Sequence, residues 1–174
     1  MDLARRRFLH GRTTTVQSAQ RPPWALTESA FTDICTRCGD CLRACPTGLL
    51  QAGPGNYPVA DFRQGHCTFC GDCSRACTPH AIAADLAQSP WDLRIVINDS
   101  CLTLQNVVCR TCGELCEAAA IRFTPRIGGV AVPQVDLDRC TGCGECLTPC
   151  PTQAISLAHR PSPTHTPNPQ EIAA

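Results

Sequence analysis

The chain has 174 residues, of which 16 are cysteine, and its formal net charge is zero because 15 arginines balance 15 acidic residues. It contains no lysine, which excludes a P-loop nucleotide site, a Schiff-base lysine and the strand lysine of protein kinases. No apolar stretch approaches the roughly 20 residues of a transmembrane helix, and no excess of basic charge indicates nucleic-acid binding, so we expect neither membrane insertion nor a nucleic-acid partner.

Residues 1–29 form a basic N-terminal arm ahead of the cysteine-rich part. Its segment Arg5-Arg6-Arg7-Phe8-Leu9 is similar to the start of a twin-arginine export signal. Residues 11–20 are polar, however, where such a signal needs an apolar segment of about 7 to 15 residues. We therefore expect a cytoplasmic protein, in which the arm is either an unstructured basic tail or a docking element that imitates or contacts an export signal.

The 16 cysteines fall into four groups of four. Three groups have the spacing C-x2-C-x2-C-x3-C, which is typical of [4Fe-4S] ligands, and there the fourth cysteine binds the neighbouring cluster. A proline follows the last cysteine directly in the first and fourth groups and after one threonine in the second. The third group is stretched, with seven residues between its first two cysteines and Glu117 in place of proline. All 16 are candidate cluster ligands: Cys35, Cys38, Cys41 and Cys45; Cys67, Cys70, Cys73 and Cys77; Cys101, Cys109, Cys112 and Cys116; Cys140, Cys143, Cys146 and Cys150.

Structural zinc and disulfides are the other common roles of dense cysteines. Zinc sites typically use two C-x2-C pairs with a longer spacer, which does not explain a third cysteine two residues further on. Closely spaced triplets cannot all pair locally as disulfides, and no secretory signal indicates an oxidising compartment. We therefore predict [4Fe-4S] clusters and keep zinc as the alternative.

Each cysteine group lies in a repeated frame of strand, cluster loop, short helix and strand. Extended segments precede the later groups at 56–62, 93–97 and 132–137, and a small-residue turn leads to an aliphatic residue after every group. We predict a small α+β fold of two tandem bacterial-type 2[4Fe-4S] ferredoxin-like modules, at residues 30–88 and 89–157. The proline-rich residues 158–174 should be a disordered tail.

Two pairings of the groups use the same 16 ligands. In a nested pairing, the second group shares ligands with the third and the first with the fourth. In the ordered pairing, based on adjacency alone, neighbouring groups exchange their fourth cysteines. Four clusters are expected, or three if the stretched group is not filled. The ligand sets of the ordered pairing are Cys35, Cys38, Cys41 with Cys77; Cys67, Cys70, Cys73 with Cys45; Cys101, Cys109, Cys112 with Cys150; and Cys140, Cys143, Cys146 with Cys116.

Segments outside the cysteine groups carry a more specific resemblance. The Arg5-Arg6-Arg7-Phe8-Leu9 start, the Arg21-Pro22-Pro23-Trp24 segment and the Trp91-Asp92-Leu93 segment before the irregular third group resemble the NapF family, the ferredoxin-type accessory proteins of periplasmic nitrate reductase. The resemblance runs from about residue 5 to residue 157. It implies a cytoplasmic iron-sulfur protein without a substrate site of its own.

The resemblance also implies a partner and a role. The partner is the immature molybdenum-containing catalytic subunit of nitrate reductase, which the protein would bind and help mature before export by assisting assembly of its [4Fe-4S] centre. A plain electron carrier, or an electron-transfer subunit of a polyferredoxin type, is the alternative, because the cysteine groups alone specify only a polyferredoxin.

Overall fold

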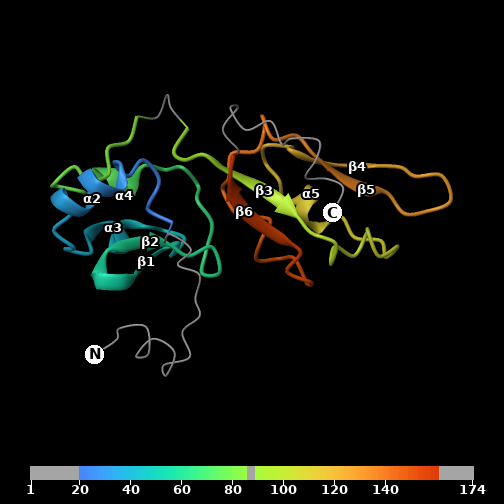
Figure 1. The fold of residues 1–174 in the computed structure, drawn as a ribbon, viewed down its shortest axis with the longest axis horizontal. Coiled ribbons are helices and arrows are strands. Elements are labelled where there is room, and N and C mark those ends of the chain that lie inside the picture. Colours follow the sequence, from blue (N-terminus) through green and yellow to red (C-terminus); the bar gives the residue numbers. More distant parts are fainter. Residues whose placement is uncertain (1–19, 86–88, 161–174) are drawn as a thin grey trace, which may run out of the picture.

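The computed structural model describes residues 20–85 and 89–160, which form an N-terminal and a C-terminal lobe (Figure 1). Residues 1–19 of the predicted arm, residues 161–174 of the predicted tail and residues 86–88 of the join lie outside the described part of the chain. Within that part, no helix is long and apolar enough to cross a bilayer.

The N-terminal module is built from short elements around two cysteine groups. Helix α2 was not expected from the sequence, and it lies across the predicted boundary between the arm and the first module. The elements are α2 (Glu28–Ile34), α3 (Asp40–Ala44), β1 (Leu50–Ala52), the 3-10 helix η1 (Pro54–Asn56), β2 (Pro58–Ala60) and α4 (Asp72–Arg75).

The C-terminal module repeats this plan with longer strands. Its elements are β3 (Leu93–Ile97), α5 (Thr111–Glu114), β4 (Ile121–Thr124), β5 (Val132–Val135) and β6 (Ile155–His159). The fourth cysteine group has turns at residues 145–149 where a short helix was predicted. Pro149 explains the difference because it has no N–H to donate to a preceding carbonyl.

Strand pairing follows the same rule in both modules. The strand after one group pairs antiparallel with the strand before the next, as β1 does with β2 and β4 with β5. The outer segments also pair, through β3 with β6 in the second module and through a single bridge between Ala25 and Ile82 in the first. This internal symmetry confirms the predicted α+β fold of two ferredoxin-like modules.

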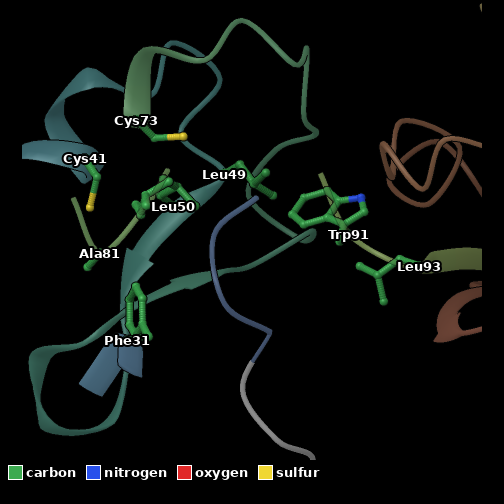
Figure 2. Close-up of a cluster of buried hydrophobic side chains, with 9 residues drawn as sticks. Phe31, Cys41, Leu49, Leu50, Cys73, Ala81, Trp91 and Leu93 are labelled. Carbon is green, nitrogen blue, oxygen red and sulfur yellow. The ribbon is translucent and has the colours of Figure 1, made fainter. Parts of the chain in front are cut away.

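Two small hydrophobic cores stabilise the modules, and cysteines belong to both cores. The first core includes Phe31, Leu49, Cys41 and Cys73, with Trp91 at its edge toward the second module (Figure 2). The second consists of Ile95, Ile121, Cys146 and Ile155. Because so few large side chains are buried, groups that bridge the cysteines should add substantially to stability.

A left-handed residue follows every cysteine group at the same place. The third residue after the fourth cysteine has a positive φ in all four repeats, although only the first of them is a glycine: Gly48 (68°), His80 (58°), Ala119 (48°) and Gln153 (51°). This conformation ends the cluster loop and turns the chain into the following strand. Its repeated use at residues with a Cβ, which costs about 1–2 kcal/mol each, indicates that the surrounding fold imposes it.

Candidate metal-cluster sites

The first cysteine group surrounds a hollow between α2, β2 and the segment after α4. The empty space there is about 320 Å³ when the open solvent at its mouth is included, and Phe31 and Ile82 contribute apolar walls. The four sulfur-bearing residues of this lining are Cys35, Cys38, Cys41 and Cys77. Three come from one loop and the fourth comes from the other group of the module.

The second hollow is the counterpart of the first. It also measures about 320 Å³, and Trp24, Leu49 and Leu50 form part of its wall. Its cysteines are Cys45, Cys67, Cys70 and Cys73. Each group of the module therefore places its fourth cysteine with the first three of its partner, in agreement with the ordered pairing and not with the nested one.

The third hollow shows how the stretched group closes. Residues 102–106 form successive turns, in which Leu104 N–H donates to the Cys101 carbonyl (3.0 Å) and Val107 N–H donates to the Leu102 carbonyl (2.8 Å). The insertion thus leaves Cys101 near Cys109, and the hollow of about 380 Å³ is lined by Cys101, Cys109, Cys112 and Cys150.

The fourth group lies on the second core. Cys146 is buried there, and Cys116 and Cys140 pack against the same cluster of side chains. Cys143 is close enough to Cys146 to influence its ionisation. The ordered set of Cys140, Cys143, Cys146 and Cys116 is therefore gathered in one region of the module.

Burial and crowding hold several of these thiols in the neutral form. Burial and then the nearby thiols Cys77, Cys35, Cys73 and Cys38 raise the pKa of Cys41 to about 12. Burial is also the main reason why the pKa values of Cys73 and Cys146 rise to about 12 and those of Cys67 and Cys112 to about 11. Thiolates at these positions need a bound cationic group beside them.

Hydrogen bonds to sulfur act in the opposite direction at Cys45. Burial disfavours the Cys45 thiolate, but donors from the Thr47 hydroxyl and from the backbone of residues 47, 49 and 50 outweigh it, and the pKa of Cys45 falls. In the second module, Ala120 N–H donates to Cys116 Sγ and Ala154 N–H to Cys150 Sγ, both at 3.3 Å. Such bonds stabilise thiolate ligands and tune the potential of a cluster.

Threonines near the cysteine sulfurs were missed by the sequence analysis. A threonine hydroxyl lies 3.3 Å from Cys101 Sγ and 3.5 Å from Cys45 Sγ, and in each case it belongs to the residue two positions further along. The recurring Cys-x-Thr pattern was the available signal, and its members are Thr47, Thr103, Thr111 and Thr152.

Left-handed backbone on both sides of the second cysteine shapes three of the loops. In the first group, Arg37 (φ 58°) and Gly39 (φ 78°) flank Cys38. In the stretched group, Arg110 has φ −134° instead, so this loop reaches its hollow by a different path. The loop of the third group is therefore not a copy of the others, although its cysteines are brought together.

The residues present fit [4Fe-4S] clusters in their chemistry. Thiolate is the ligand that such clusters use, and three of the hollows each offer four cysteines on otherwise largely apolar walls. Among the residues that the structure describes, no three His, Cys, Asp or Glu side chains lie close enough together to hold a single metal ion.

Comparison with known families agrees with this chemistry. Residues 34–82 and residues 107–154 each match a family model described as a 4Fe-4S dicluster domain. The chain therefore has two tandem dicluster domains and binds several [4Fe-4S] clusters, as predicted.

Individual relatives are similar over nearly the whole chain. A protein of Haemophilus influenzae named "Ferredoxin-type protein NapF" is 46% identical over 166 residues, covering 90% of this chain and 94% of the relative. A protein of the same name from Escherichia coli K12 is 41% identical over 159 residues, covering 91% and 96%. A "Methylamine utilization ferredoxin-type protein MauM" of Methylophilus methylotrophus is 31% identical over 159 residues, covering 82% and 70%.

Proposed function

Because the chain belongs to the NapF family of ferredoxin-type proteins, we propose that it is an accessory protein of periplasmic nitrate reductase. In this role it binds the immature molybdenum-containing catalytic subunit in the cytoplasm, before export, and helps to assemble that subunit's own [4Fe-4S] cluster. The observation that carries the proposal is the similarity over about nine-tenths of both chains to proteins that are named NapF.

All 16 cysteines serve as ligands in this proposal, and they hold four clusters in the ordered sets. Two shared hollows in the first module and one in the second support the exchange of fourth cysteines. The folded insertion of residues 102–108 supports a filled third site, because it leaves Cys101 and Cys109 on one lining. The clusters supply one-electron chemistry, and the chain orients them and limits their contact with water.

The protein has no substrate site of its own in this proposal. The linings of the three cysteine hollows, as described, contain no His, Asp or Glu that could act as a general acid or base. Cys38 and Cys70 are exposed, so the first and second sites lie near the surface, where a partner protein can approach them.

A binding experiment tests the proposed partner and the role of the N-terminal arm. The purified protein is immobilised anaerobically and exposed to the catalytic subunit with its signal peptide or to the mature subunit. We expect retention of the precursor and weaker retention of the mature form. Deletion of residues 1–12 tests the arm, and deletion of residues 163–174, an equally long segment, is the control. Failure to retain the precursor, or equal retention of an unrelated exported protein, would refute the partner.

Electron transfer to a finished enzyme is the competing role. The two roles are distinguished by purifying the catalytic subunit from cells that lack this protein and measuring the iron content of that subunit. A subunit deficient in iron supports maturation. A fully loaded subunit, in cells whose nitrate reduction has stopped, supports the carrier instead.

A further inference from the structure

The two modules touch through the loops of the second and the fourth cysteine group. The Cys67 N–H donates to the carbonyl of Cys143 at 2.8 Å, and the Thr148 hydroxyl donates to the carbonyl of Phe62 at 3.4 Å. Gly144 lies against the Phe62 ring so closely that a Cβ at this glycine would be 2.2 Å from a ring carbon. The two cluster loops are therefore in direct backbone and side-chain contact.

The other neighbour relationships lie inside the modules. Cys41 of the first group and Cys73 of the second belong to the same core, where both are visible in Figure 2. In the second module, Cys112 of the third group packs against the core that contains Cys146 of the fourth. From one end of the molecule to the other, the groups therefore follow the order first, second, fourth, third.

Aromatic side chains cover this contact. Phe62 and Trp91 meet edge to face with their ring centroids 5.4 Å apart, and Phe69 meets Trp91 at 6.4 Å. Trp91 is only 8% exposed, and Figure 2 shows it on the side of the first core that faces the C-terminal module. These rings keep water from one side of the second group, as buried aromatic side chains do.

We propose that the contact between the Cys67 and Cys143 loops makes the second and fourth cluster sites neighbours, so that the modules exchange electrons at this junction. The first and third sites are then the two ends of the path. Each exchange moves one electron from a reduced cluster, which is oxidised, to an oxidised cluster, which is reduced, with no bond or proton transferred. An external low-potential one-electron reductant supplies the first electron. The inference rests on the proposed ligand sets and not on the identity of the partner.

Two double variants of the full chain test the junction, because each retains one cluster per module. Cys38→Ala with Cys109→Ala removes a ligand from the two end sites, whereas Cys70→Ala with Cys143→Ala removes one from the two junction sites. Both leave the backbone groups of Cys67 and Cys143 in place. Each protein is reduced with dithionite, and its electron paramagnetic resonance spectrum and iron content are measured.

We expect both variants to contain about half of the parent's iron, since each loses two of four cubanes. The variant that retains the junction sites should show signals split by spin coupling between its two clusters, and the variant that retains the end sites should show two unsplit signals. The reverse pattern, or no splitting in the first variant, overturns the junction. Iron that remains at the parent's level instead overturns the ligand sets on which the inference rests.

A second measurement needs no altered cluster and covers the case in which a variant fails to fold. In the intact protein, the Cys67 amide should exchange its hydrogen with deuterium slowly because it donates a hydrogen bond to the Cys143 carbonyl of the second module. Exchange as fast as that of an exposed loop amide would overturn the junction.

Discussion

The Cys67 amide and the Cys143 carbonyl form a 2.8 Å hydrogen bond that joins the second cysteine group to the fourth. The two residues occupy different positions in their groups, the first and the second cysteine respectively, so this bond does not repeat any contact within a module. It places the inner loops of the two modules against each other. The variants below test how this packing and the clusters contribute to stability.

Gly144 should be less replaceable than another glycine of similar conformation. Gly144 (φ +83°) would press a Cβ into the Phe62 ring, whereas Gly128 (φ +72°) has nothing within 4 Å of that position. Both Gly→Ala changes pay the left-handed penalty of about 1–2 kcal/mol, and Gly144→Ala should lose about 1–3 kcal/mol more through overpacking. Anaerobic denaturant unfolding of the loaded protein measures both, and equal losses would contradict the contact.

Trp91 should matter for its volume and not for its polar atom. It is buried in the first core, and its indole Nε1 has no hydrogen-bond partner within the described part of the protein. Trp91→Ala should therefore lower the free energy of unfolding by about 3–5 kcal/mol. Trp91→Phe, the matched control, retains a ring and should cost less than half as much. The prediction fails if the two variants unfold at the same denaturant concentration.

The iron content per chain should show how many of the four cluster sites are filled. The parent should bind about sixteen irons per chain, as four cubanes do. Cys109→Ala should reduce this to about twelve, and so should Cys143→Ala, its equivalent in a regular group. A parent with about twelve irons that Cys109→Ala does not lower further would show that the stretched group is empty. Sulfide is quantified in the same samples and should match the iron.

Removal of the clusters should unfold much of each module. Once the iron is gone, Cys41, Cys73 and Cys146 carry pKa values of about 12, so at neutral pH they are protonated thiols that cross-link nothing. Anaerobic treatment with a chelator should reduce the far-ultraviolet circular dichroism signal, and iron with sulfide should restore it. An unchanged signal after complete iron loss would mean that the small cores suffice.

Residues 28–34 and 145–149 show two limits of local reasoning. Helix α2 lies ahead of the first cysteine and crosses the predicted boundary between the arm and the first module, and Phe31 becomes fully buried only because the first module packs around it. The missing helix in the fourth group could have been anticipated from Pro149, since proline in a helix interior removes a hydrogen bond.

The sequence by itself determined the kind of site and the number of repeats. Cysteines at spacings of two, two and three residues are carried by one short loop, so their chemistry follows from local chain geometry, and the recurrence of that loop predicts two modules. Only the tertiary structure decided which groups are neighbours. The pairing of the groups and the contact of Cys67 with Cys143 depend on packing between different groups, about which the cysteine spacing within one group carries no information.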